Sequence, residues 1–179
     1  MNNNASHRTT VLGIRILSIV LVCTLGSSTL SAQDSGAPPA LFKSAEAITA
    51  ELAELASASA NAAGWTVQVS PGVTIRQRTS GNVNFAIIHP YSIEIYRIIE
   101  GSGTLVTGGK LIQPYADSPS NDVIRTEHGI EGGLARQVNA GDVLVLQPGT
   151  PHWFSAIDGE SITYMESRIA VSTHPIRFE

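Results

Sequence analysis

The segment HPYSIEIYRIIEGSGTL, residues 89–105, decides the fold of this chain. Apolar and polar residues alternate through its middle, which is typical of a β-strand with one buried face, and the glycines near its end indicate a turn. Similar short stretches, separated by glycine or proline, continue from Trp65 to Val171. Many short strands after a single helix predict an all-β antiparallel sandwich or barrel.

The strands expected from this pattern are short, and turn residues separate them. Val83, Phe85, Ile87 and His89 are expected to share one face of their strand, and the glycines at 101 and 103 are expected to form a turn. Residues 114–133 predict neither strand nor helix, and we expect them to form a long loop at one rim. The predicted strands cover residues 66–70, 73–79, 83–89, 93–99, 104–107, 110–113, 134–138, 142–146, 152–156 and 161–171.

A helix is predicted within residues 44–63, after a linker at 33–43 that is small, polar and proline-bearing. Ser44 is suited to cap its start. Ile48, Leu52 and Leu55 recur at the spacing of one helical face, so we expect the helix to pack against the main domain.

Residues 1–32 have the features of a secretory signal peptide. Arg8 and Arg15 precede a largely apolar run at 16–25, which small residues follow up to Ala32. The run is too short for a membrane span of roughly 20 residues, so we expect cleavage and no membrane attachment afterwards. Cys23 leaves a lipoprotein open as an alternative, although Val22 is bulky for that signal. The predicted location is secreted or periplasmic.

The composition of the chain after the predicted cleavage limits the classes of partner that it could bind. Cleavage would remove the only cysteine and leave nine basic against fifteen acidic residues, a net charge of −6. A chain without cysteine tolerates an oxidising compartment and depends on no disulfide. An acidic balance without a basic cluster argues against nucleic acid and anionic lipid as partners.

Three residues on separate predicted strands form a candidate metal site. His89 ends one strand, Glu94 lies early in the next, and His152 opens a third after the turn at 149–151. Two imidazoles and one carboxylate from three strands match the facial triad, which leaves coordination positions open. An ion pair between Glu94 and Arg76 or Arg78 is the main alternative, because a buried carboxylate is costly unless it is paired or coordinated.

Two segments of the chain resemble the two signatures of the cupin superfamily. Residues 89–105 keep the spacing from the glutamate Glu94 to the glycine Gly101, and GDVLVLQPGTPHWF, residues 141–154, resembles the second signature, with Gly149 and His152 in place. VTGGKL, IEGG and PHWF resemble small bacterial single-domain cupins more closely still. The resemblance implies a jelly-roll barrel over residues 65–179. It also implies a divalent ion (iron, manganese, zinc or nickel), a small-molecule ligand in the barrel and a homodimer.

The chain departs from the cupin pattern at Ile87, where the first signature commonly has another histidine. Three ligands hold a metal more weakly and less selectively than four. The loss is therefore open to two interpretations: a weaker metal site or an abandoned one. His128, on the predicted rim loop, is a further candidate to replace the missing ligand.

Two functions follow as hypotheses from these residues. The first is an exported metal-dependent enzyme, such as a dioxygenase or isomerase, and the second is a non-catalytic small-molecule-binding barrel with a degenerate metal site. No nucleophile–base constellation is recognisable, so hydrolysis by a triad has no support. Ile95, Arg97 and Ile99 are expected to form an outer face that pairs with a second copy or packs under the helix.

Overall fold

The structure is a computed structural model that describes residues 38–60, 62–81, 85–114, 116–118 and 122–171. Residues 39–179 form one compact unit. The predicted signal peptide, 1–32, and the first part of the predicted linker lie outside the described residues. In the described part of the chain, no helix has the length and apolar character needed to cross a bilayer.

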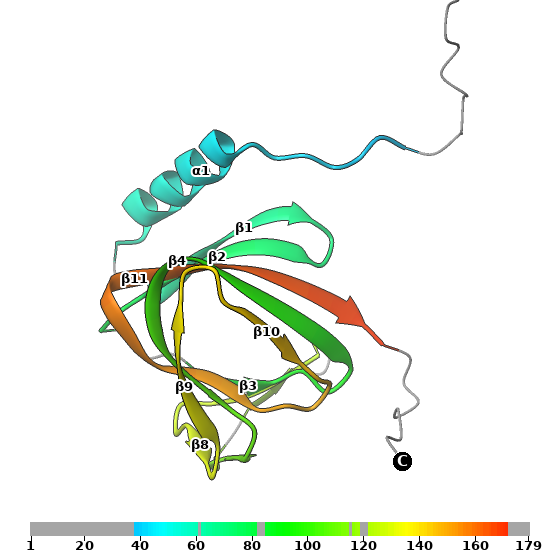
Figure 1. The fold of residues 1–179 in the computed structure, drawn as a ribbon, viewed down its shortest axis with the longest axis vertical. Helices are drawn as coiled ribbons and strands as arrows, with labels where there is room; N and C mark the ends of the chain where they lie inside the picture. Colours follow the sequence, from blue (N-terminus) through cyan, green and yellow to red (C-terminus); the bar gives the residue numbers. More distant parts are fainter. Residues whose placement is uncertain (1–37, 61, 82–84, 115, 119–121, 172–179) are drawn as a thin grey trace, which may run out of the picture. The chain divides into compact units, whose positions relative to one another are not determined.

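One helix and eleven strands make up the described fold (Figure 1). The helix, α1, spans Ala45–Ala58. The strands are β1 Gly64–Ser70, β2 Val73–Thr79, β3 Ala86–Ile88, β4 Ser92–Thr107, β5 Lys110–Leu111, β6 Ala116–Ser118, β7 Val123–Thr126, β8 Ile130–Glu131, β9 Leu134–Asn139, β10 Val143–Leu146 and β11 His152–Ala170.

All strand pairs are antiparallel, and nine strands belong to one sheet. Its main path runs β1-β2-β11-β3-β7-β6, while β4 pairs with β11, β9 and β10. The antiparallel all-β fold with an N-terminal helix is therefore confirmed. The sheet is not closed, because β1 and β6 at the ends of the path each pair with one described strand. Figure 1 shows the long strands β4 and β11 bending around the interior.

The prediction of separate short strands was wrong in two places, because β4 and β11 are each continuous. Gly101 and Gly103 bend β4 without ending it. Gly101 has φ +80°. Its neighbours in β4, Glu100 and Ser102, pair with Thr163 and Asp158 of β11, so Gly101 lies opposite the bulge at residues 159–162. A Cβ at Gly103 would stand 2.5 Å from the carbonyl oxygen of Ala156. Glycine permits these close backbone approaches, so the strands bend and the ladder resumes.

The expectation of a structureless loop over residues 114–133 was also wrong. Strands β6, β7 and β8 lie within it, and β7 pairs with β3 through Ile87 and Arg125. Val123 and Ile124 are half-buried and Thr126 is buried. Such short pairs are difficult to recognise among turn residues, because three or four residues show too little alternation.

Helix α1 begins where the sequence predicts and ends earlier than residue 63. The Ser44 hydroxyl accepts a hydrogen bond from the Ala47 amide (3.2 Å), which caps the first turn. The amide of Ser59 donates to the carbonyl of Leu55 (3.1 Å) at the other end. The helix contacts β1, and its apolar stripe, Ile48, Leu52 and Leu55, is half-buried.

The core lies on the inner face of the bent sheet. Along β4, Ser92, Glu94, Tyr96 and Ile98 are buried, while the intervening positions are more exposed. Arg97 is exposed on the outer face, as expected. The buried core cluster consists of Tyr96, Ile98, Leu105, Val138, Leu146, Phe154, Ile162 and Tyr164. The alternation of β4 therefore places the carboxylate of Glu94 inside, next to the aromatic core.

Candidate metal centre

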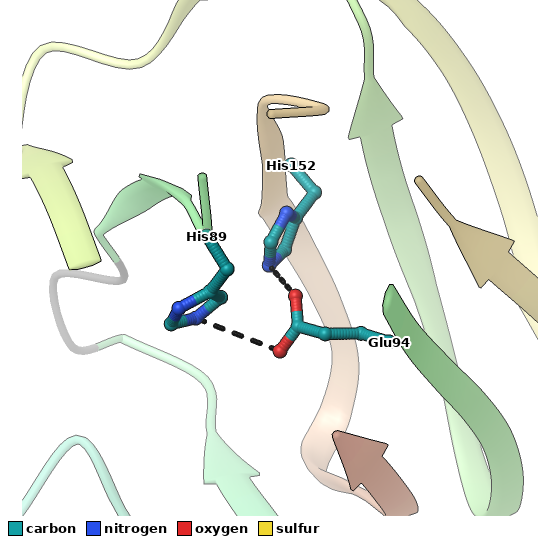
Figure 2. A group of neighbouring side chains, drawn as sticks. All are labelled: His89, Glu94 and His152. Atoms are coloured by element: carbon teal, nitrogen blue, oxygen red, sulfur yellow. Dashed lines mark ion pairs between the residues drawn. The ribbon is translucent and has the colours of Figure 1, made fainter. Parts of the chain in front are cut away.

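The structure brings His89, Glu94 and His152 together (Figure 2). His89 directly follows β3, Glu94 lies on β4, and His152 is the first residue of β11. Each offers one ligand atom, and these atoms all lie within 4.8 Å of one another. All three residues are buried, and Glu94 is 1% exposed. The three side chains therefore face one small common space, as the facial-triad hypothesis requires.

Backbone hydrogen bonds join the two signature segments at this point. The amide of Gly149 donates to the carbonyl of His89 (2.9 Å), which ties the turn before β11 to the end of β3. His152 pairs with Ile87 across the same two strands. Glu94 lies between Leu146 of β10 and Arg168 of β11. The ladder, rather than a flexible loop, thus sets the spacing of the three side chains.

Both imidazoles are held in the tautomer that a metal ligand needs. Nδ1 of His152 donates to the carbonyl of Thr150 (3.0 Å), and Nδ1 of His89 donates to the carbonyl of Asp122. A carbonyl oxygen can only accept, so Nδ1 carries the proton in each ring. Both Nε2 atoms then face Glu94 with a lone pair.

The side chain of Asp122 fixes the position of that carbonyl, and sequence reasoning missed this residue. One carboxylate oxygen of Asp122 accepts from the amide of Tyr91 (3.0 Å), and the other accepts from the hydroxyl of Ser92 (2.7 Å). Asp122 also has φ +49°, a conformation that aspartate tolerates better than most residues. It acts as a positioning residue for His89. Its place in an irregular segment gave no pattern that could have revealed it.

Burial keeps both imidazoles neutral. It lowers the pKa of His152 to about 4, and it also lowers the pKa of His89. Burial raises the pKa of Glu94, whereas His89 and Arg168 act in the opposite direction. Nε2 of His152 lies 3.2 Å from one Glu94 oxygen, and Nε2 of His89 lies 3.5 Å from the other. Lone pairs that face one another at these distances favour a cation between them.

Arg168 supplies one cationic group at this place, and sequence reasoning missed it. Its Nη2 donates to Nε2 of His89 (2.9 Å), to Glu94 (3.1 Å) and to Glu166 (3.0 Å). Arg168 lies directly opposite Glu94 in the β4–β11 ladder. The i, i+2 spacing of Glu166 and Arg168 in the last predicted strand was the available signal, because it places both on one face.

The alternative to metal ligation, an ion pair of Glu94 with Arg76 or Arg78, is not found among the described side chains. Arg76 pairs with Glu166 (2.7 Å), and Nε of Arg78 donates to the hydroxyl of Tyr164 (3.5 Å). Arg168 reaches Glu94 because β11 lies next to β4, whereas β2 lies beyond β11. One further strand separates the two expected arginines from the carboxylate.

Among the described residues, no further histidine, cysteine or acidic side chain joins the group of His89, Glu94 and His152. Ile87 lines the same cavity as the two histidines, and His128 is exposed and lies outside the group. The buried hydroxyl of Tyr96 lies 3.2 Å from Nε2 of His152. Burial raises the pKa of Tyr96 well above its usual value, so this hydroxyl keeps its proton.

The donor set fits a divalent transition-metal ion. Two neutral imidazoles and one carboxylate suit iron, manganese, zinc or nickel, and nothing in this set selects one of them. Arg168 competes for the same lone pairs, since it donates to two of the three ligands.

Similarity to known proteins is found among solved structures. No protein-family model and no curated protein matches the chain. A solved structure from Bacillus halodurans is 14% identical with a TM-score of 0.42, and the match covers 76% of this chain and 86% of that one. A cupin protein from Bacteroides fragilis is 14% identical with a TM-score of 0.39, and the match covers 66% and 85%.

The vicilin of Solanum melongena is 20% identical with a TM-score of 0.36. The match covers 56% of this chain and 24% of the vicilin, so the chain spans about a quarter of that protein. A protein described as a cupin is thus among the similar structures. The open antiparallel sheet with an N-terminal helix agrees with the all-β architecture predicted from the sequence.

Proposed function

We propose that this chain is an exported cupin-type protein that binds a divalent metal ion through His89, Glu94 and His152. A small oxygen-rich ligand occupies the adjoining cavity in this proposal. The observation that carries the metal site is the tautomer of both imidazoles: each Nδ1 donates to a backbone carbonyl, and each Nε2 lone pair faces Glu94. This is the arrangement by which proteins orient histidine ligands.

The bound ion would supply Lewis acidity or oxygen activation, the chemistry of an isomerase or a dioxygenase. The residues of the chain act around it. Glu166 is a second anionic partner of Arg168, so the guanidinium would remain paired when Glu94 coordinates the ion. Tyr96 keeps its proton and can donate a hydrogen bond inside the cavity, to His152 or to a ligand.

A non-catalytic small-molecule-binding barrel is the second candidate, and Arg168 is the observation that favours it. Its guanidinium already compensates the charge of Glu94 and satisfies the lone pair of His89. With Ile87 where another ligand is common, the chain can bury Glu94 without a metal. The two functions therefore differ in what compensates Glu94 when a ligand is bound.

Metal content separates the two candidates. Protein purified without chelators is analysed for iron, manganese, zinc and nickel, together with His89→Ala and His152→Ala. His128→Ala is the matched control, because His128 is exposed and outside the group. A metal enzyme predicts bound ion in the parent and the control, and loss of ion in both test variants.

Equal metal content in all four proteins, or no ion in any of them, would contradict the proposed metal site. The non-catalytic binding barrel would then be the remaining candidate. Where iron is bound, oxygen consumption with a panel of enols and catechols tests the dioxygenase. An isomerase predicts no oxygen consumption and a conversion that depends on the metal.

Export and dimerisation belong to the same proposal. Export rests on residues 1–32, and mass spectrometry of the secreted chain tests cleavage after Ala32. A homodimer is supported by apolar residues at the outer face of β4 and β10: Val143 is 60% exposed, Val145 56% and Ile99 48%. Light scattering measures the oligomeric state, and a monomer would contradict the dimer without affecting the metal site.

A further inference from the structure

Four arginines line one cavity. Its volume is about 370 Å³, within the usual range of small-molecule sites, and it contains His89 and His152 on its wall. The arginines are Arg76, Arg78, Arg125 and Arg168. Among the residues that the structure describes, no aspartate or glutamate lines this cavity.

Two of these arginines are neutralised by buried acids. Arg168 bonds Glu94 and Glu166, and Arg76 pairs with Glu166. Two guanidinium groups and two carboxylates form this ionic cluster, so its charges balance. Glu94 and Glu166 are 1% and 4% exposed. The cluster leaves no positive charge for a ligand when no metal is bound.

The other two, Arg78 and Arg125, are not neutralised by any carboxylate among the described side chains. Arg78 donates from Nε to the hydroxyl of Tyr164 (3.5 Å), which is a long bond to a neutral group. The guanidinium carbon of Arg125 lies 4.8 Å from the centre of the Phe85 ring. A guanidinium is a fork of donors that suits a carboxylate, and it is more weakly hydrated than an ammonium group.

Most of the remaining wall is apolar or aromatic. Its members are Ala63, Phe85, Ile87, Tyr96, Val123, Trp153, Phe154 and Tyr164. A ligand that fits this wall carries an apolar body, and one that fits the two arginines carries a negative charge. A neutral polar ligand can accept hydrogen bonds from these guanidinium groups but does not compensate their charge, so it is expected to bind more weakly than a carboxylate.

We propose that the cavity binds a small carboxylate with an apolar body, and that Arg78 and Arg125 recognise its charge. This inference deepens the proposed function, because it names the chemical class of the cavity ligand. The recognition does not require the metal, since neither arginine touches His89, Glu94 or His152 in the described contacts. The carboxylate and the metal can therefore be tested separately.

The test uses chelator-treated protein and calorimetric titration at neutral pH. The probes are 3-phenylpropionate and its neutral amide, 3-phenylpropionamide, which share the apolar body. We expect the acid to bind at least about tenfold more tightly than the amide, because a charged hydrogen bond contributes more than a neutral one. Equal affinity for acid and amide, or no binding of the acid at millimolar concentration, would overturn the proposal.

Substitutions assign the recognition to the two arginines. Arg78→Met and Arg125→Met are each expected to weaken acid binding about tenfold and to leave amide binding unchanged. Arg136→Met is the matched control, because Arg136 is exposed on β9 and does not line the cavity. Arg78→Lys and Arg125→Lys, which keep the charge without the fork, are expected to lose less than the methionine variants.

Losses in the two methionine variants no larger than in Arg136→Met would contradict the assignment. Thermal unfolding of each variant identifies any that fails to fold, and the lysine variants then decide the result. A protein that binds the acid but no metal would retain this inference and lose the metal part of the proposed function. A protein that binds metal but shows no preference for the acid would retain the metal part of the proposed function and contradict this inference.

Discussion

The ionic cluster, Arg76, Glu94, Glu166 and Arg168, and the arginine pair, Arg78 and Arg125, use the same side chain in two ways. In the cluster, each guanidinium is matched by a buried carboxylate. In the pair, neither guanidinium has a carboxylate among the described side chains, and Arg125 is exposed. One part of this cationic cavity wall therefore compensates buried carboxylates, whereas the other part is available to a ligand.

The largest expected effect is the loss of the carboxylate ligand. Glu94→Gln keeps the shape of the side chain and removes its charge, so metal affinity is expected to fall about 100-fold or more. Glu166→Gln changes an acid of the same cluster without touching the three ligands, and we expect a smaller loss. Competition with a coloured chelator measures both, and equal affinities in the two variants would contradict the role of Glu94.

Removal of Arg168 should affect the metal-free protein most. Arg168→Met leaves Glu94 without its cation, and breaking a buried pair in this way destabilises a protein by about 3–5 kcal/mol. Arg125→Met, at an exposed position, is expected to cost no more than about 0.5 kcal/mol. Denaturant unfolding of chelator-treated protein measures the difference.

Metal should reverse part of the effect of Arg168→Met, because an ion replaces the lost positive charge at Glu94. The stabilisation on adding the ion is then larger in Arg168→Met than in the parent. Equal stabilisation in both proteins would mean that Arg168 and the ion do not compete for the same place.

Acid should destabilise the metal-free protein through His152. Its pKa is about 4 in the folded chain against an ordinary histidine value of 6.5, so the unfolded chain binds the proton more readily. The contribution of the neutral His152 side chain to the free energy of unfolding is fully present above pH 6.5. It decreases as the pH falls towards 4, by about 3 kcal/mol in total. The raised pKa of Glu94 acts in the opposite sense.

The contribution of His152 is isolated by subtracting the pH dependence of His152→Gln from that of the parent. Denaturant unfolding at several pH values between 7 and 4 provides both curves. The difference between them should shrink as the pH falls. A constant difference across this window would show that the buried imidazole is not the titrating group.

The smallest expected effect comes from restoring the absent histidine. Ile87 lines the cavity and pairs with His152, so Ile87→His offers another imidazole and should raise metal affinity roughly tenfold. Ile88→His is the control, since Ile88 is the next residue of β3 and does not line the cavity. Chelator competition compares the two, and equal affinities would mean that position 87 does not face the metal.

The sequence was sufficient to predict the antiparallel all-β architecture and to single out the three side chains that the structure brings together, because both depend on local patterns. Strand alternation placed Glu94 inside, and the two cupin-like segments carried His89 and His152. The bounds of β2, Val73–Thr79, follow directly from the turn at Pro71 and Gly72. Each of these features is visible within one short segment of the chain.

What the sequence did not reveal depends on which strands are neighbours. Arg168 was missed because its partner, Glu94, is 74 residues away, and only the β4–β11 pairing brings them together. The carbonyl of Asp122 was missed because it contacts His89 from an irregular segment. The continuity of β4 and β11 was missed because glycine in a strand bend looks like glycine in a turn.

A crystal structure of the metal-loaded protein, with the ion located by anomalous scattering, would decide whether His89, Glu94 and His152 hold a metal. We expect one ion about 2.0–2.2 Å from Nε2 of His89, Nε2 of His152 and the carboxylate of Glu94. The Arg168 guanidinium should then bond Glu166 alone. An ion bound elsewhere, with Arg168 still donating to Glu94 and His89, would contradict it.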